Sequence, residues 1–181
     1  MVDPIVLMVA EKPSISNSIA SILSGGSPNR RSGACRNSPV YEFPGKFMGR
    51  SVTFRVTAVL GHVLSTDFPP KYQNWDTTDP ASLFAAEIVK SESDPKANVV
   101  RHLQQEARGA SFLVLWLDCD REGENICFEV IDNTVSSMLR LDGKQQVFRA
   151  KFSSVTAQDI RAALTTLGVP DKNAARAVDA R

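Results

Sequence analysis

Two short apolar runs constrain the fold of this 181-residue chain more than any other feature of its sequence. Residues 5–10 (IVLMVA) and 112–117 (FLVLWL) are six residues long, and polar residues follow each of them at once. Short apolar runs of this kind are typical of strands that are buried on both faces of a parallel sheet. They are also far below the roughly 20 residues that cross a bilayer. The runs therefore predict two inner strands of a sheet.

Local patterns elsewhere predict the elements that surround these strands. Ile15 and Ile19 share one helical face, and Gly25 is placed to end that helix. The remaining predictions are a hairpin of residues 40–43 and 52–59 that turns at Pro44-Gly45, helices over 81–90 and 96–108, a helix that follows Glu124 and carries an apolar stripe to Leu139, a strand over 147–152, a helix from the cap Thr156 to Leu167, and a further helix capped by Asp171.

This order of elements predicts the fold class. Strands that alternate with helices form an α/β domain, here with a largely parallel central sheet flanked by helices. Residues 24–39 are rich in Ser, Gly, Pro and Arg and predict a long surface loop, whose Arg30, Arg31 and Arg36 fit either solvation or contact with nucleic acid. Because sites in such sheets lie at the carboxyl ends of strands, the residues after the two inner strands are the candidates for function.

Charge and cysteine content narrow the class of protein. Lys and Arg number 21 against 20 Asp and Glu, and a net charge of +1 gives no basic field over the whole molecule, so binding of a polyanion depends on local placement. The hydrophobic share of 43% is that of a chain that folds. Three cysteines without a C-x-x-C pair argue against a disulfide framework and a zinc site. We expect a soluble intracellular protein in a reducing compartment, since no signal-peptide core begins the chain.

An acidic cluster directly follows the second inner strand. Asp118, Asp120 and Glu122 stand at every second position, and alternate residues of extended backbone point the same way, so the three carboxylates could converge. Two carboxylates about 4 Å apart repel by roughly 4 kcal/mol at an effective dielectric near 20, and a cation would relieve that repulsion. Oxygen ligands with no His or Cys nearby favour Mg²⁺. The alternative is a solvated loop that places negative charge at a helix N-terminus.

Glu11 and Lys12 occupy the equivalent place after the first inner strand. If the two strands are neighbours, Glu11 meets the acidic cluster although 107 positions separate it from Asp118. A carboxyl crowded by three others could donate a proton, and a lysine at a helix N-terminus is well placed for a phosphate oxygen. The alternative for Lys12 is an exposed charge without a role.

Several motifs together resemble one known family. Residues 10–14 (AEKPS) and 118–124 (DCDREGE) resemble the Toprim domain, a Rossmann-like α/β domain, of type IA DNA topoisomerases. The longer stretches 116–129 and 148–156, with the Gly-His pair at 61–62, resemble eukaryotic topoisomerase III, and its beta form more than its alpha form. The resemblance extends over essentially the whole chain.

The resemblance implies an enzyme that cuts one DNA strand through a tyrosine, holds the 5′ phosphate covalently, passes another strand and reseals the break, and so relaxes or decatenates DNA. It implies that Glu11 assists proton transfer at the 3′ oxygen and that Lys12 contacts the scissile phosphate. Metal and lysine placed on a phosphodiester stabilise the charge that develops in transesterification. The implied sites are an Mg²⁺ site of Glu11, Asp118, Asp120 and Glu122, and nucleic-acid contacts of Lys12, His62 and Arg121.

The chain lacks the tyrosine that this mechanism needs. Tyr41 and Tyr72 are its only tyrosines, whereas the family's nucleophile lies in a separate domain far beyond residue 181. We therefore expect an N-terminal fragment, with a Toprim domain over 1–168 and the start of the next family domain over 169–181. Two residues of that start fit the family's pattern, Asp179 and Arg181. The resemblance further implies single-stranded DNA, with RNA as a second candidate, a scaffold protein of the topoisomerase III complex as partner, and a location in the nucleus and also the cytoplasm.

Two other functions stay open at this point. A Toprim-type nuclease would use Mg²⁺ and water in place of tyrosine. A non-catalytic module would bind nucleic acid through Mg²⁺ or the loop arginines. A dinucleotide-binding domain is disfavoured, because no G-x-G-x-x-G follows the first strand.

Three side chains also keep two interpretations each. His62 fits either DNA contact or packing. Trp75 could stack on a base with Tyr72, or it could be buried in a cluster that supports its loop. Thr156 matches the family, but a helix cap explains it equally well.

Overall fold

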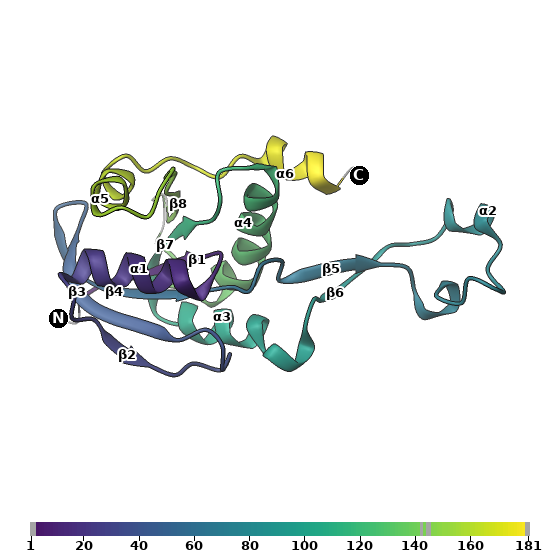
Figure 1. Cartoon of the computed structure of the whole chain (residues 1–181), viewed down its shortest axis with the longest axis horizontal. Helices are drawn as coiled ribbons and strands as arrows, with labels where there is room; N and C mark the ends of the chain where they lie inside the picture. Colours follow the sequence, from purple (N-terminus) through teal and green to yellow (C-terminus); the bar gives the residue numbers. More distant parts are fainter. Residues whose placement is uncertain (1–2, 142, 144–145, 180–181) are drawn as a thin grey trace.

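A six-stranded sheet forms the centre of the molecule in the computed structural model, which describes residues 3–141, 143 and 146–179 (Figure 1). Its strands lie in the order β2-β3-β4-β1-β7-β8. Their bounds are β1 Ile5–Ala10, β2 Asn29–Arg31, β3 Val40–Phe47, β4 Arg50–Ala58, β7 Ala110–Trp116 and β8 Val147–Arg149. β1 is parallel to β4 and β7, and β7 to β8, whereas β3 is antiparallel to β4 and β2 to β3. The predicted, largely parallel sheet is confirmed.

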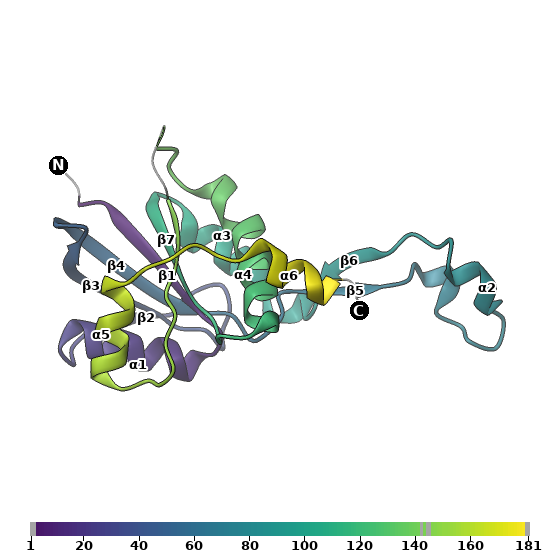
Figure 2. The same cartoon turned by 90° about the horizontal axis from the view of Figure 1, so that it is seen from above.

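Helices cover both faces of this sheet (Figure 2). α1 (Pro13–Ser24) and α5 (Ala157–Thr165) pack on one face, and α3 (Val99–Ala107) and α4 (Arg121–Thr134) pack on the other. Successive residues of a strand point to opposite faces, so Met8 belongs to the first hydrophobic cluster and Leu7 to the second. Burial on both faces explains why β1 is an unbroken apolar run.

β1 and β7 are direct neighbours in the sheet. They pair in parallel, with Ala10 of β1 opposite Trp116 of β7. Both strands therefore end at the same edge, and the segments that follow them, which begin at Glu11 and Leu117, leave the sheet side by side. This adjacency confirms the prediction on which the candidate site depends.

The hairpin of β3 and β4 is longer than the sequence predicts. The chain turns at Met48 and Gly49, which both have positive φ. The predicted turn at Pro44-Gly45 is wrong, since Pro44 pairs with Thr53 inside the hairpin. A proline is tolerated there because it lies beyond the stretch of β3 that pairs with β2, so that one side of β3 is already an edge.

A second segment also differs from its prediction. The sequence predicts a helix over residues 81–90, but only α2 (Pro80–Leu83) is helical, and β6 (Val89–Glu92) pairs with β5 (Leu64–Asp67) in a separate two-stranded ribbon. No residue of 81–90 is buried, so its apolar spacing does not reflect packing against a core. The described residues also form three short 3₁₀ helices, η1 Pro70–Tyr72, η2 Pro95–Ala97 and η3 Val135–Ser137.

Smaller differences concern the ends of elements. β2 lies inside the predicted loop 24–39, and the predicted strand over 147–152 is regular only as β8. The predicted caps are confirmed: the Thr156 Oγ1 accepts the N–H of Asp159 at 3.2 Å, and Asp171 accepts the N–H of Asn173 at 2.9 Å ahead of α6 (Lys172–Asp179). None of the described helices combines the length and the apolar composition that crossing a membrane requires.

Candidate active site at the ends of β1 and β7

Glu11 joins the ends of the two inner strands. It follows β1, and its Oε2 accepts a hydrogen bond from the backbone N–H of Asp118, beyond β7, at 3.0 Å. The side chain is only 13% exposed, so the carboxylate is held between the two strand ends. The predicted meeting of Glu11 with the start of the acidic cluster is confirmed.

Lys12 lies over the same point from the solvent side. Its Nζ is 3.4 Å from Oε1 of Glu11 and 3.7 Å from Oδ2 of Asp118, and the side chain is mostly exposed. The carboxylate of Glu11, and after it that of Asp118, raises the pKa of Lys12 above its ordinary value. Lys12 therefore presents a protonated ammonium group to solvent at the edge of the sheet. Its expected contact with a phosphate and the alternative, an exposed charge without a role, both remain predictions.

The other two acidic side chains turn away from this point. Asp120 is the N-cap of α4, where its Oδ1 accepts the N–H of Gly123 at 2.7 Å. Glu122 lies in the first turn of α4 and pairs with His62, at 3.2 Å. The predicted convergence of Asp118, Asp120 and Glu122 is therefore wrong. Helix α4 starts at Arg121, so the alternation of an extended strand does not continue to Glu122. Within the described residues, no three His, Cys, Asp or Glu side chains form a group that could hold a metal ion.

Gly123 permits this close joint between β7 and α4. A Cβ atom at this position would lie 2.0 Å from the carbonyl oxygen of Asp118, well inside any allowed contact. Only glycine lets the first turn of α4 contact the backbone of the acidic loop. The glycine of the DCDREGE motif is thus explained by packing.

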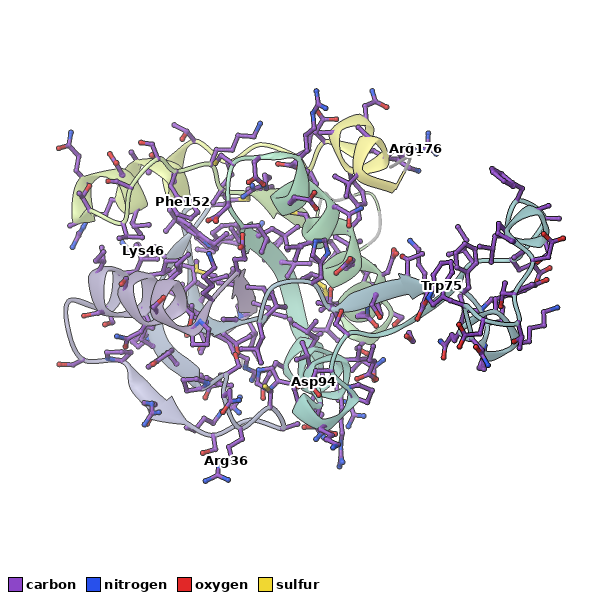
Figure 3. The ribbon with its side chains drawn as sticks, turned by 45° about the vertical axis from the view of Figure 1, so that its right-hand side comes forward. Arg36, Lys46, Trp75, Asp94, Phe152 and Arg176 are labelled. Carbon is purple, nitrogen blue, oxygen red and sulfur yellow. The ribbon has the colours of Figure 1, made fainter. Side chains whose placement is uncertain are left out.

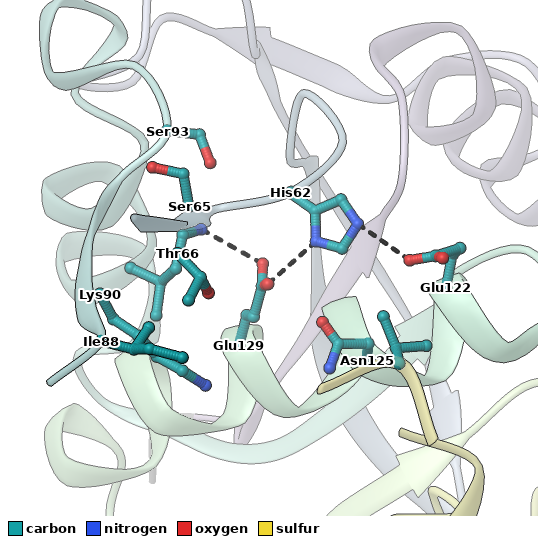
Figure 4. Close-up of a pocket in the computed structure, with 11 residues that line it drawn as sticks. His62, Ser65, Thr66, Ile88, Lys90, Ser93, Glu122, Asn125 and Glu129 are labelled. Atoms are coloured by element: carbon teal, nitrogen blue, oxygen red, sulfur yellow. Dashed lines mark hydrogen bonds and ion pairs between the residues drawn. The ribbon is translucent and has the colours of Figure 1, made fainter. Parts of the chain in front are cut away.

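His62 is held by two carboxylates beside a pocket (Figure 4). Its Nδ1 is 2.9 Å from Oε1 of Glu129 and its Nε2 is 3.2 Å from Oε2 of Glu122, while Glu129 also accepts the N–H of Val63 at 2.7 Å. Burial lowers the pKa of His62, but the two carboxylates outweigh burial and raise it above its ordinary value. The pocket, of about 690 Å³, is bordered by β5, β6 and α4. His62 is thus oriented by protein groups and remains partly exposed to a ligand, so both of its interpretations stand.

Arg149 is a central residue that the sequence reasoning missed. It is fully buried, and its guanidinium donates to the carbonyl oxygen of Asp118 at 2.8 Å and to the carboxylate of Glu124 at 2.9 Å. Glu124 in turn accepts the N–H of Asp171 at 2.8 Å. The sequence predicts only that residue 149 lies in a strand, whereas its burial comes from packing against α4, where Glu124 lies.

The remaining predicted residues lie in varied surroundings. Arg121 is exposed at the first position of α4. Tyr41 is buried in the core, and Tyr72 packs against Phe68 with 6.3 Å between ring centroids. Trp75 is 72% exposed, so its expected burial in a supporting cluster is wrong. Arg181 and the side chain of Asp179 lie outside the described residues.

The arginines of the predicted loop divide into two kinds. Arg31 forms ion pairs with Glu42 and Glu106 and therefore links β2 to β3 and α3. Arg36 is exposed and points away from the molecule (Figure 3), as expected of a solvated loop. Binding of nucleic acid by the loop arginines remains a prediction for Arg30 and Arg36, the two that are exposed.

Comparison with known proteins gives a consistent result. The family described as Toprim domain matches residues 6–155. DNA topoisomerase 3-beta of Oryza sativa subsp. japonica is 58% identical over 178 residues, which are 98% of this chain and 20% of that protein. DNA topoisomerase 3-alpha of Homo sapiens is 40% identical over 176 residues, 97% of this chain and 17% of that protein. The greater resemblance to the beta form is confirmed, and the chain spans about one fifth of the length of these relatives.

A solved structure shows the same fold. The full-length topoisomerase I of Thermotoga maritima matches with a TM-score of 0.58 over 97% of this chain and 23% of that chain. The two sequences are 23% identical, so the likeness concerns the fold alone.

Proposed function

Because this chain belongs to the Toprim domain family, we propose that it is the Toprim part of a type IA topoisomerase of the III-beta class. Such an enzyme breaks and rejoins single DNA strands through a tyrosyl 5′-phosphate and relaxes or decatenates DNA. The observation that carries the proposal is the group of Glu11, Lys12 and Asp118 at the ends of two neighbouring parallel strands. Ligands of open α/β sheets bind at this edge.

Each residue of this group has a proposed role. The ammonium of Lys12 holds a non-bridging oxygen of the scissile phosphate, where its charge stabilises the transition state. Glu11, beside it, moves a proton to or from the 3′ oxygen. Arg149 positions the loop by holding the carbonyl oxygen of Asp118 from below. The nucleophilic tyrosine comes from outside the chain, because Tyr41 is buried in the core and Tyr72 lies in η1, in the segment between β5 and β6.

Mg²⁺ belongs to the same proposal. Carboxylate oxygens suit this ion in their chemistry, but only those of Glu11 and Asp118 meet at one point, around the ammonium of Lys12. For Asp118, Asp120 and Glu122 to hold the ion, with Glu11 beside them, Asp120 would have to leave the N–H of Gly123 and Glu122 would have to leave His62. Bound there, Mg²⁺ would supply charge neutralisation at a phosphate.

Substrate and partners extend the proposal beyond the fold. The relatives are named DNA topoisomerases, which supports DNA as substrate and gives no support to a nuclease or a non-catalytic module. RNA as a second substrate, contacts from His62 and Arg121, a scaffold protein, and a location in the nucleus and also the cytoplasm remain proposals. So does the division of the chain into residues 1–168 and 169–181.

A chimera tests the proposed activity. This chain would replace the matching fifth of the Oryza sativa relative, and relaxation of supercoiled DNA would be measured with Mg²⁺ present. We expect the chimera to relax DNA, and Glu11→Gln to lower strand cleavage by about 100-fold, since it removes a proton donor. Asp3→Asn, an exposed carboxylate outside the site, is the matched control. Unchanged cleavage by Glu11→Gln would refute its role, and an adduct of DNA with the 181-residue chain alone would show that the nucleophile lies within it.

Calorimetry tests the metal. We expect weak Mg²⁺ binding by the chain that becomes tighter when inorganic phosphate is added, because three carboxylates rarely complete an octahedral shell. The double variant Asp118→Asn, Asp120→Asn should lose this binding. Equal affinity in the variant would remove these residues from the metal site.

A further inference from the structure

The segment 64–92, called the arm below, stands apart from the rest of the molecule (Figures 1 and 2). β5 and β6 pair over four positions, from Leu64 opposite Glu92 to Asp67 opposite Val89. Beyond the ribbon, residues 68–88 carry only the short elements η1 and α2. The arm therefore projects from the sheet as a thin ribbon with a looped tip.

The arm has no core of its own. No residue from 64 to 92 is buried, and all of them are described. Phe84 is 95% exposed, Trp75 72% and Ile88 62%. An isolated two-stranded ribbon is marginally stable in water, and aromatic side chains this exposed are typical of interaction sites. These exposed side chains make the arm a surface that a partner could cover.

Local contacts shape the tip without covering its aromatic residues. Asp79 caps α2 by accepting the N–H of Ala81 at 3.0 Å, and Asp67 accepts the N–H of Phe68 at 2.7 Å. Figure 3 shows Trp75 on the arm, separated from the central sheet. The tip is thus a formed surface whose apolar side chains are available to a partner.

Charge identifies the kind of partner. The arm contains five acidic residues and two lysines, a net charge of −3, whereas the rest of the chain carries 19 basic and 15 acidic residues, a net charge of +4. A negative arm repels phosphates, so a nucleic-acid strand is a poor occupant. A protein surface that is apolar at its centre and basic around it is complementary to the arm.

We propose that the arm docks on a basic, apolar surface elsewhere in the same topoisomerase polypeptide, with Trp75 and Phe84 as its buried anchors. The proposal rests on the proposed function, which makes the chain part of a longer enzyme. The relatives are about five times as long as the chain, which covers 20% of the Oryza sativa protein. A surface on the same polypeptide is present at high effective concentration, so two anchor side chains are enough to keep the arm docked on it.

Hydrogen exchange on the arm tests this docking. In the isolated chain the amides of residues 68–88 should exchange rapidly, and in the chimera with the Oryza sativa relative they should exchange at least ten times more slowly. The double variant Trp75→Ser, Phe84→Ser should restore rapid exchange in the chimera. Leu139→Ser, an exposed apolar residue outside the arm, is the matched control and should leave protection intact.

The outcomes separate docking from the proposed function. A chimera that relaxes DNA while its arm exchanges as fast as in the isolated chain would overturn docking and leave the function standing. A chimera with a protected arm that fails to relax DNA would support docking and count against the function. A single-stranded oligonucleotide that slows amide exchange in the arm of the isolated chain, with no such effect in Trp75→Ser, would show that the arm binds nucleic acid. That result would overturn the proposal.

Discussion

The arm and the rest of the described chain, called the body below, place the same kinds of side chain in different surroundings: the body buries them and the arm exposes them. Phe54 in the body is 3% exposed and packs with Phe43 and Phe47, whereas Phe84 on the arm is 95% exposed. The body buries its sheet on both faces and supports the site at the ends of β1 and β7, so its stability comes from within. The arm joins the body at Leu64, which packs against the second hydrophobic cluster, and ribbon pairing and local contacts shape the residues beyond it. The difference indicates that substitutions in the body alter unfolding, and substitutions on the arm alter docking.

Arg149→Met should have the largest effect on the body. The variant leaves the carboxylate of Glu124 buried without its cation, and breaking such a buried pair costs about 3–5 kcal/mol of the free energy of unfolding. Urea unfolding measures this loss. Arg36→Met, at an exposed arginine, is the control and should be close to neutral. If Arg149→Met is also neutral, the joint between β7, β8 and α4 does not depend on this ion pair.

Gly123→Ala should destabilise the same joint by a smaller amount. The added methyl group meets the carbonyl oxygen of Asp118, and forced overpacking of this kind costs about 1–3 kcal/mol. Gly168→Ala is the matched control, because a Cβ there lies 4.0 Å from the nearest atom. Equal unfolding free energies for the two variants would contradict the packing role given to Gly123.

His102 should make the stability of the body depend on pH. Its Nδ1 accepts the N–H of Cys35 and its Nε2 contacts Thr57, and burial lowers its pKa, with Arg31 adding to the shift and Glu106 opposing it. The unfolded chain therefore takes up a proton below about pH 6.5, before the folded chain does. The free energy of unfolding should fall as the pH drops below 6.5, by at most about 1.4 kcal/mol per pH unit from this group.

His102→Asn isolates this contribution. Its amide cannot titrate in this range, so unfolding measured at pH 5 and pH 7 should change less in the variant than in the original chain. Parallel pH profiles for the two proteins would show that His102 is protonated equally in the folded and unfolded states.

Phe84→Ala should have the smallest effect on the isolated chain. The side chain covers nothing there, so the free energy of unfolding should change by no more than about 0.5 kcal/mol. Phe54→Ala is the matched phenylalanine in the core and should lose about 3–5 kcal/mol. A loss above about 1 kcal/mol for Phe84→Ala would mean that the arm is part of the cooperative body after all.

Sequence patterns predicted the body well because its elements obey local rules. Burial on both faces made β1 and β7 continuous apolar runs, and the caps Thr156 and Asp171 bind the backbone within three residues of themselves. The arm was predicted poorly for the same reason. Its helix-like spacing over residues 81–90 had no core to face, so nothing enforced a helix there.

The sequence by itself determined which residues follow the two inner strands, and thereby placed Glu11, Lys12 and Asp118 at one edge of a parallel sheet. Only the tertiary structure decided how they are arranged. The start of α4 turned Asp120 to its own helix and Glu122 toward His62, and packing of α4 buried Arg149 beneath Asp118. The contacts of Glu122 with His62 and of Arg149 with Asp118 join segments that are far apart in the chain. Local periodicity describes which way a residue faces, whereas the partner that it meets depends on which other element covers that face.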